Sequence, residues 1–279
     1  MNHIIYNNKL VEESSFLVPI SNRALLYGDS LFETVRIMNG RPCFLSMHLD
    51  RLKKGMDILK MKPNWHDLSS KVFSIIDKNK INKGATLKIV VYRNEGGKYT
   101  PESNKSSYFM HIEEAPNFYG LNSKGWKIDF FKDHLKPFNA FSSFKSSNCF
   151  NYILAAIWGK ELKIDQAIIL NQEGRISEGY NSNIFAVISN KLYTPPIEEG
   201  CINGVMRRII ILTAKKRGMV TIEQPMEKEL LLESDEIFLS NVNFGIRWVG
   251  ALHQKRYMNK TSKLLLNDIN NEIKLKSSL

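Results

Sequence analysis

The sequence predicts an α+β fold of two domains, and three observations support this prediction. Strand and helix patterns alternate over residues 1–114. Pro116 and Gly120 then interrupt the periodicity, so residues 115–122 are expected to be an interdomain linker. A second set of helices and short strands follows over residues 123–279. The chain length of 279 residues agrees, because a typical domain has about 150 residues.

The N-terminal domain opens with short strands and tight turns. Residues 1–10 predict a strand pair that turns at Asn7-Asn8. Residues 31–38 predict a strand that ends at Asn39-Gly40 and returns over residues 41–45. An Asn-Gly pair is a strong hairpin signal because both residues readily adopt positive φ.

A long amphipathic helix is expected over residues 45–61. Its apolar residues recur every three or four positions, as one face of a helix requires, and Ser46 is placed to cap its N-terminus. His48 and Arg51 then lie about one helical turn apart. The remaining expected elements are helices over residues 68–81, 148–162, 205–217, 229–233 and 260–273, and strands over residues 85–92, 107–112, 126–131, 166–170, 184–187, 191–193 and 236–239.

The composition is that of a folded globular protein. Apolar residues make up 43% of the chain and charged residues 24%, which excludes the composition typical of disordered chains. No apolar run approaches the roughly 18 residues of a membrane span, and residues 1–8 lack the features of a secretion signal. We therefore expect a cytoplasmic protein with no membrane partner. Cys43, Cys149 and Cys201 lack metal-binding spacing and are expected to be buried apolar side chains.

The net charge of +11 suggests two kinds of partner, nucleic acid and a small anionic substrate. The basic residues are dispersed, however, and the sequence has neither a basic run interleaved with aromatic residues nor zinc-finger spacing. We therefore expect no nucleic-acid partner and no metal. A solvated lysine-rich surface accounts for the excess charge, and a non-catalytic basic binding protein remains an alternative function.

Three polar features are candidates for chemistry. Lys145 follows the phenylalanine-rich stretch 138–144, where desolvation would activate an amine, although a lysine alone is more often a surface residue. Glu178 lies between two strand patterns, where it could meet a cationic ring nitrogen or cap a turn. Gly204 precedes the helix over residues 205–217, whose backbone N–H groups could bind an anion, as any helix start can.

Taken in order with two further motifs, these features resemble the fold type IV pyridoxal-phosphate enzymes, the class IV aminotransferase family. That family includes branched-chain and D-amino-acid aminotransferases and aminodeoxychorismate lyase. The resemblance covers essentially the whole chain and implies the two-domain α+β fold of the family. It rests on five motifs, which are RALLYGDSLFETVR at 23–36, HLDRL at 48–52, KSSN at 145–148, ISEGYNSNIF at 176–185 and NGVMR at 203–207.

The resemblance implies that the chain binds pyridoxal 5′-phosphate (PLP). Lys145 would be the catalytic residue, holding the cofactor as a Schiff base and later moving the proton. Glu178 would pair with the pyridine nitrogen and keep it protonated, so that the ring accepts electrons. Arg51 would bind the phosphate as a charged fork, while the role of His48 would be structural. Four further residues would complete the phosphate site mainly through their backbones, namely Val205, Met206, Asn241 and Val242.

Three departures from the aminotransferase patterns favour a lyase. Phe150 stands five residues after Lys145, where branched-chain aminotransferases have a tyrosine that contacts the phenolic oxygen of the cofactor. The loop over residues 239–246 and the motif over residues 204–207 also resemble those of aminodeoxychorismate lyases. The resemblance therefore implies conversion of 4-amino-4-deoxychorismate to p-aminobenzoate and pyruvate in folate biosynthesis. The alternative is an aminotransferase that acts on branched-chain or D-amino acids with 2-oxoglutarate.

The resemblance to the lyase implies a small anionic amine as the substrate. Arg93 and Lys98 flank a glycine-rich loop that resembles the substrate loop of the lyase, and their charges would suit a substrate with two carboxylates. A solvated loop is the alternative interpretation of these two residues. Tyr27 and Thr34 are candidate donors near the leaving group. The resemblance also implies a homodimer.

Overall fold

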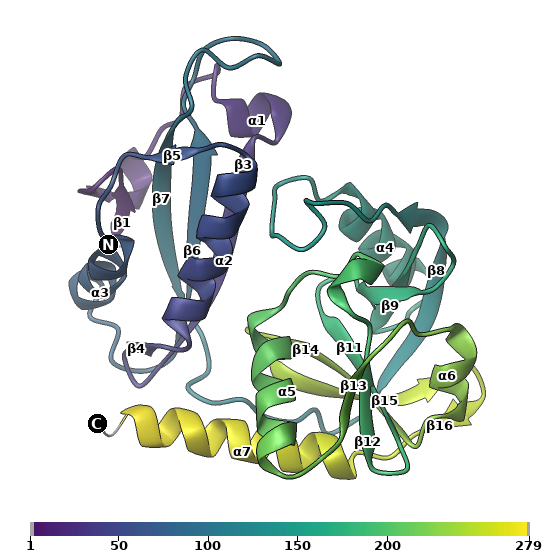
Figure 1. The fold of residues 1–279 in the computed structure, drawn as a ribbon. Coiled ribbons are helices and arrows are strands. Elements are labelled where there is room, and N and C mark those ends of the chain that lie inside the picture. The colour runs from purple at the N-terminus through teal and green to yellow at the C-terminus, as the bar shows by residue number, and fades with distance from the viewer. Residues whose placement is uncertain (1–2, 278–279) are drawn as a thin grey trace. The chain divides into compact units, whose positions relative to one another are not determined.

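The computed structural model describes residues 3–277, which form two compact units (Figure 1). Unit 1 runs to Phe118 and also takes in Phe144–Asn148, and unit 2 comprises Tyr119–Ser143 and the chain from Cys149 onward. Both units combine helices with sheets, so the predicted α+β fold class is confirmed. No helix within the described residues is long and apolar enough to cross a bilayer.

Unit 1 is built on a largely antiparallel sheet with the strand order β2-β1-β7-β6-β3-β4, and β5 pairs with β7. Strand β3 pairs with β6 from Ser30 opposite Tyr92 to Ile37 opposite Ala85. The strands are β1 (His3–Tyr6), β2 (Lys9–Glu12), β3 (Ser30–Met38), β4 (Arg41–Pro42), β5 (Lys62–Pro63), β6 (Ala85–Arg93) and β7 (Lys105–Glu114).

Both predicted hairpins of unit 1 are present. Asn7 and Asn8 join β1 to β2, Asn39 and Gly40 join β3 to β4, and all four residues have positive φ. This left-handed conformation is easiest for glycine and asparagine, which explains why the turns form at these positions. Residues 1–2, where the first predicted strand begins, lie outside the described residues.

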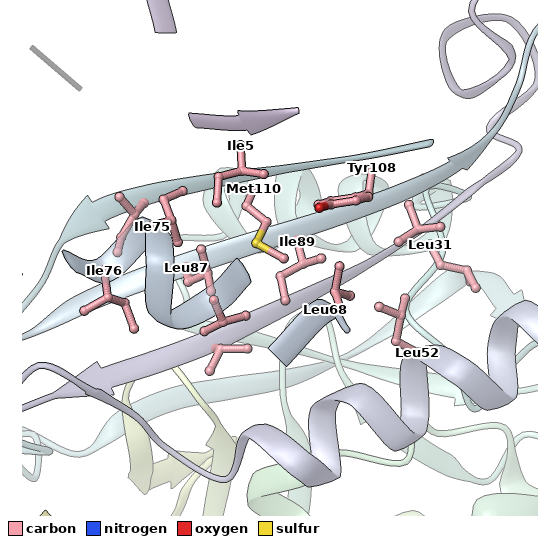
Figure 2. Close-up of a cluster of buried hydrophobic side chains, with 14 of the residues drawn as sticks. Ile5, Leu31, Leu52, Leu68, Ile75, Ile76, Leu87, Ile89, Tyr108 and Met110 are labelled. Carbon is pink, nitrogen blue, oxygen red and sulfur yellow. The ribbon is translucent and has the colours of Figure 1, made fainter. Parts of the chain in front are cut away.

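The long helices α2 (Leu45–Ile58) and α3 (Leu68–Lys78) cover the core of unit 1 (Figure 2). The predicted cap at Ser46 is wrong, because α2 begins directly after Phe44, which has a left-handed φ of 55° and makes no side-chain cap. Unit 1 also contains η1 (Glu13–Ser15) and α1 (Arg23–Tyr27). Buried side chains from both helices and the sheet meet in one cluster, which includes Ile5, Leu31, Leu52, Leu68, Ile75, Leu87, Ile89, Tyr108 and Met110.

Unit 2 is built on a mixed sheet with the strand order β10-β9-β8-β15-β14-β11-β12-β13, and β16 pairs with β15. Helix α4 packs on β8 and β9, while α5 and α7 pack on each other and on β14. The strands are β8 (Trp126–Lys136), β9 (Gln166–Asn171), β10 (Ile176–Gly179), β11 (Asn183–Ile188), β12 (Lys191–Thr194), β13 (Thr221–Glu223), β14 (Glu236–Asn241), β15 (Gly245–Leu252) and β16 (Lys255–Arg256). The helices are α4 (Phe150–Glu161), η2 (Ile197–Glu199), α5 (Val205–Lys216), α6 (Lys228–Glu233) and α7 (Lys260–Ser277).

The two units differ from the predicted domains at the segment that carries the candidate lysine. The sequence assigns this segment to the C-terminal domain, whereas Phe144–Asn148 packs with unit 1. The Phe32 N–H donates to the Lys145 carbonyl oxygen at 2.8 Å, and the Ser147 N–H donates to the Ser30 carbonyl oxygen at 3.2 Å. The segment therefore pairs with the start of β3, a long-range contact that no local pattern reveals.

The cysteine prediction holds at two of three positions. Cys43 and Cys201 are buried, whereas Cys149 is half-buried just before α4. Burial raises the pKa of the Cys43 and Cys201 thiols to about 12, so both thiols are neutral at physiological pH. These two side chains act as apolar residues.

Candidate active site

A buried charge cluster joins β3 to α2 in unit 1. The Glu33 carboxylate accepts a fork of hydrogen bonds from Arg51, from Nε to Oε1 at 2.7 Å and from Nη2 to Oε2 at 2.6 Å. His48 Nδ1 lies 2.7 Å from Glu33 Oε2. The fork fixes the plane of the Arg51 guanidinium and occupies its Nε–Nη2 edge with Glu33. The one-turn spacing of His48 and Arg51 brings both side chains to the same carboxylate.

The cluster keeps Glu33 ionised. Burial alone would raise the pKa of Glu33, but the charge of Arg51 and the hydrogen bonds from His48 and Arg51 outweigh it and lower the pKa to about 2. Sequence reasoning missed Glu33, although a signal was present. Leu31, Glu33 and Val35 alternate along one face of β3, and a carboxylate among buried apolar residues needs a charged partner.

Lys145 lies on the segment that pairs with β3. Its side chain is half-buried, and its Nζ lies 4.8 Å from the centroid of the Phe32 ring. Lys88 of β6 contacts the same ring, with its Nζ 5.2 Å from the centroid. Because the backbone of Lys145 is hydrogen-bonded to β3, the position of the residue is fixed by the sheet.

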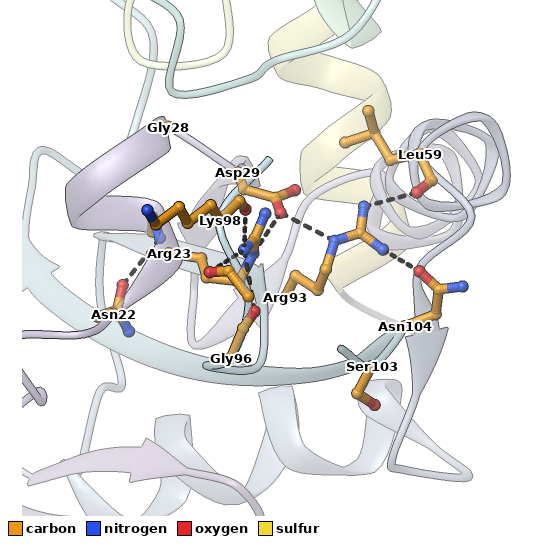
Figure 3. Close-up of polar contacts among 12 residues, drawn as sticks. Asn22, Arg23, Gly28, Asp29, Leu59, Arg93, Gly96, Lys98, Ser103 and Asn104 are labelled. Atoms are coloured by element: carbon orange, nitrogen blue, oxygen red, sulfur yellow. Dashed lines mark hydrogen bonds and ion pairs between the residues drawn. The ribbon is translucent and has the colours of Figure 1, made fainter. Parts of the chain in front are cut away.

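The glycine-rich loop after β6 is held by a buried arginine of α1 (Figure 3). Arg23 donates from Nη1 to the carbonyl oxygens of Gly96, Gly97 and Lys98, the last at 2.6 Å. Its Nε donates to Asp29 at 2.9 Å. Three carbonyl oxygens converging on one guanidinium give the loop a defined path.

Arg93 is committed to contacts within unit 1 (Figure 3). Its Nε donates to Asp29 at 2.8 Å, its Nη1 to Asn104 at 2.5 Å and its Nη2 to the carbonyl oxygen of Leu59 at 2.7 Å. The Arg93 residue is only 6% exposed. These contacts favour the structural interpretation of Arg93 over substrate binding, because each guanidinium nitrogen already has an acceptor.

The other three candidate substrate residues are more accessible. The Lys98 side chain is exposed on the glycine-rich loop. Tyr27 ends α1, and its ring centroid lies 5.8 Å from that of Tyr99. Thr34 is half-buried on β3, opposite Lys88 of β6. Lys98, Tyr27 and Thr34 therefore remain candidates.

In unit 2, Glu178 is buried on β10 and three groups donate to its carboxylate. Lys136 Nζ of β8 donates to Oε1 at 2.6 Å, and the Tyr152 hydroxyl of α4 donates to the same oxygen at 2.8 Å. The Ile202 N–H donates to Oε2 at 3.0 Å. Sequence reasoning identified Glu178 but missed Lys136 and Tyr152, which lie 42 and 26 residues away in the chain.

The start of α5 presents backbone N–H groups, as predicted. Gly204 precedes the helix with extended backbone and no side-chain cap. The first N–H groups of a helix, here those of Val205 and Met206, have no acceptor within the helix. A Cβ on Gly204 would lie only 2.0 Å from Asn183 Oδ1, so the close approach of these segments requires glycine.

Asn241 ends β14, and Val242 begins the turn that leads to β15. The Asn241 side-chain oxygen accepts from the N–H groups of Asn243 at 2.9 Å and Phe244 at 3.0 Å. The Tyr119 hydroxyl donates to the Val242 carbonyl oxygen at 2.8 Å. The Asn241 side chain thus shapes the turn, and the phosphate role of these two residues stays a prediction.

The described residues fit a phosphorylated pyridine cofactor at three points. Glu178 is a buried carboxylate of the kind that holds a ring nitrogen. The α5 start, kept open by Gly204, suits a phosphate group. Lys145 is a positioned, half-buried amine. Glu178 and the start of α5 belong to unit 2, and Lys145 belongs to unit 1. Each of these features is held in place by contacts within its own unit.

Comparisons with known proteins identify the family. Residues 30–252 match the model of the amino-transferase class IV family. Over 247 residues the chain is 26% identical to aminodeoxychorismate lyase of Bacillus subtilis, covering 85% of this chain and 82% of that protein. Over 251 residues it is 26% identical to the branched-chain-amino-acid aminotransferase of Salmonella typhimurium, covering 85% and 81%.

Solved structures share the fold. The branched-chain aminotransferase of Thermoproteus uzoniensis superimposes with a TM-score of 0.90 at 23% identity, covering 99% of this chain and 95% of that one. The branched-chain aminotransferase of Escherichia coli gives a TM-score of 0.87 at 21% identity, covering 96% and 92%. Because the family match spans most of the chain, the protein belongs to the class IV aminotransferases, a family of PLP-dependent enzymes.

Proposed function

We propose that the chain is a PLP-dependent 4-amino-4-deoxychorismate lyase that forms p-aminobenzoate and pyruvate. The observation that carries this proposal is the residue five positions after Lys145. The pattern typical of branched-chain aminotransferases has a tyrosine at this position. This chain has Phe150 instead, which is 78% exposed. Tyr152, two residues further, donates its hydroxyl to Glu178. The tyrosine contact typical of those aminotransferases is therefore not supplied from this position.

Residues of both units have roles in the proposed reaction. PLP, when bound, withdraws electrons from the substrate carbon that bears the amine. Lys145 would hold the cofactor and remove the proton from that carbon. The carbon–oxygen bond to the enolpyruvyl group would then break as the ring becomes aromatic, and the enolpyruvate that leaves would take up a proton to become pyruvate. Glu178 would hold the ring nitrogen protonated throughout.

Anchoring groups for the cofactor and substrate complete the proposal. Arg51 would bind the phosphate, together with backbone groups at the start of α5 and in the β14–β15 turn, which are those of Val205, Met206, Asn241 and Val242. Lys98 would attract the substrate carboxylates, and Tyr27 or Thr34 would donate a hydrogen bond near the leaving group. We further propose a homodimer, which light scattering would test.

An aminotransferase is the second candidate function. It is supported by the 26% identity to the Salmonella branched-chain-amino-acid aminotransferase, which equals the identity to the Bacillus lyase. In that reaction the same lysine would return the proton to the cofactor, which would keep the amino group, and water would release the substrate as a keto acid. The two functions share the cofactor site and differ in the fate of the proton.

A product assay separates the two candidates. Purified holoenzyme is mixed with 4-amino-4-deoxychorismate, and p-aminobenzoate and pyruvate are quantified against Lys145→Ala. Lys88→Ala serves as the matched control, because Lys88 contacts the same Phe32 ring from the exposed side of β6 and has no proposed role. We expect equimolar products from the wild type and the control and none from Lys145→Ala.

The opposite result also has a clear meaning. A yellow, PLP-loaded wild type that forms neither product contradicts the lyase proposal. Branched-chain and D-amino acids with 2-oxoglutarate are then assayed, and glutamate formation would support the aminotransferase.

A further inference from the structure

The buried environment of Glu178 contains a second cation whose role the proposed function leaves open. Lys136 is only 6% exposed. Its ammonium donates to Glu178 Oε1 at 2.6 Å and to the carbonyl oxygen of Gly200, and it lies 5.1 Å from the centroid of the Tyr152 ring. The Lys136 charge is thus enclosed by a carboxylate, a carbonyl oxygen and an aromatic face.

Stability alone is a weak reason for such a lysine. Desolvation of a buried ion pair offsets most of its Coulombic gain, so apolar residues of similar size are often as stabilising. Lys136 ends β8 and reaches Glu178 on β10, which is not the neighbouring strand. The same carboxylate is the group proposed to hold the cofactor ring. These facts point to a role in the chemistry of Glu178.

The donors leave Glu178 with one acceptor position. An ionised carboxylate offers about four acceptor sites, two on each oxygen. Among the residues that the structure describes, Oε1 accepts from both Lys136 and Tyr152, while Oε2 accepts only from the Ile202 N–H. A ring N–H would therefore meet Oε2 as the fourth donor, and Glu178 would be shared between two cations.

The other titratable groups that face Glu178 are neutral or paired. Burial and the Glu178 charge raise the pKa of Tyr152 well above its usual value, and burial raises that of Cys201 to about 12. Arg207, whose charge also acts on Cys201, is paired with Glu223 at 2.6 Å. Lys136 is thus the cation in direct contact with this carboxylate.

We propose that Lys136 is a positioning residue that sets how firmly the cofactor ring nitrogen holds its proton, acting through Glu178. The inference rests on the proposed pairing of Glu178 with that nitrogen. Because Lys136 neutralises part of the Glu178 charge, the carboxylate holds a second cation less strongly than it would alone. Lys136 thereby moderates the electron withdrawal by the ring.

The test measures ring protonation directly in the holoenzyme. Protein loaded with PLP that carries ¹⁵N in the ring is titrated from pH 5 to pH 10, and the ¹⁵N chemical shift gives the midpoint. Lys136→Met removes the charge and keeps the length, while Lys136→Arg keeps the charge. We expect Lys136→Met to raise the midpoint by on the order of one pH unit, and Lys136→Arg to stay near the wild type.

A matched control separates charge from hydrogen bonding. Tyr152→Phe removes a neutral donor from the same Oε1 and is expected to move the midpoint much less than Lys136→Met. An equal shift in Tyr152→Phe, or wild-type midpoints in both Lys136 variants, would overturn the inference. So would a ring nitrogen that stays protonated to pH 10 in every variant. Lys136→Gln replaces Lys136→Met if the latter does not fold.

A separate variant tests whether Glu178 contacts the ring nitrogen of the cofactor at all. Glu178→Gln removes the anion, so the ring nitrogen is expected to give the shift of a neutral pyridine across the whole range. A wild-type signal in Glu178→Gln would contradict the proposed pairing of Glu178. A changed signal there, with no response to Lys136→Met, would contradict only the role of Lys136.

Discussion

The ionised Glu33 carboxylate is required to compensate the buried Arg51 guanidinium. Removing one partner of a buried pair leaves an uncompensated charge and typically costs about 3–5 kcal/mol. Glu33→Gln should therefore lower the free energy of unfolding of the apoprotein by this amount at pH 7. Urea unfolding followed by tryptophan fluorescence measures it. Glu114→Gln, at an exposed position on β7, is the control and should change the free energy by less than about 0.5 kcal/mol.

The effect of Glu33 should also depend on pH in one direction. Folding lowers the pKa of Glu33 from 4.5 to about 2, so its ionised form stabilises the folded state above pH 4.5, by roughly 3 kcal/mol. This contribution declines as the pH falls below 4.5 and is lost as it passes through 2. The difference between wild type and Glu33→Gln should therefore shrink between pH 5 and pH 3. A constant difference over that range would contradict the assignment.

Motifs single out candidate site residues, whose roles stay predictions. Lys145, Glu178 and Arg51 stand in motifs shared with the family, and the structure gives each of them a fixed position. Lys136 stands in no motif, and its contact with Glu178 joins two strands that are separated by β9 in the sheet. Arg93 shows the opposite case. Its position beside a glycine-rich loop suggested substrate binding, but the structure shows that its guanidinium donates to acceptors within unit 1.

At the scale of elements, the start of α5 depends on Gly204. A Cβ there would overlap Asn183 Oδ1, so Gly204→Ala must displace either the helix start or Asn183. We expect a loss of about 1–3 kcal/mol in stability and at least a roughly tenfold weaker affinity for PLP, measured by absorbance titration of the apoprotein. Gly159→Ala, in a helix with no contact closer than 3.6 Å, should leave the affinity unchanged. Equal affinities in both variants would contradict the phosphate role of α5.

The glycine-rich loop offers a second prediction at this scale. Arg23→Lys loses the Nη1 group that donates to the carbonyl oxygens of Gly96, Gly97 and Lys98. Amide hydrogen exchange in peptides that cover residues 94–104 should become about tenfold faster, which corresponds to roughly 1.4 kcal/mol. Arg41→Lys, in the exposed β3–β4 hairpin, should leave the exchange of this loop unchanged. Unaltered exchange in Arg23→Lys would show that other contacts hold the loop.

Elements with strong periodicity or turn signals were predictable, and those shaped by distant contacts were not. The hairpin at Asn39-Gly40 and the amphipathic α2 follow from local sequence. Strand β15 was missed, because two glycines weaken its strand pattern and its pairing with β8 and β14 decides its conformation. The start of α2 at residue 45 was predicted, but its cap was not, since Phe44 precedes the helix in a left-handed conformation that its residue type does not favour.

At the scale of the whole molecule, the α+β class and the two-part organisation follow from the alternation of patterns and from the break near Pro116. The membership of Phe144–Asn148 in unit 1 does not, because it rests on hydrogen bonds between residues more than a hundred positions apart. Chain order is therefore a poor guide to which unit carries the candidate lysine. Contacts between residues so far apart in the sequence depend on tertiary packing. They produce no periodic pattern that could be recognised in the sequence.

The net charge of +11 leads to a prediction about substrate capture. A basic protein attracts an anionic substrate over a distance set by the Debye length, which falls from about 10 Å at 0.1 M salt to about 3 Å at 1 M. For a substrate with two carboxylates, kcat/KM should fall about fivefold between 50 mM and 500 mM NaCl, mainly through KM. Steady-state kinetics at constant pH measures this change.

Lys98→Gln should reduce the salt dependence more than Lys191→Gln, although both remove one charge from an exposed side chain. Equal effects would mean that general charge captures the substrate, and a kcat/KM independent of salt would contradict electrostatic capture altogether.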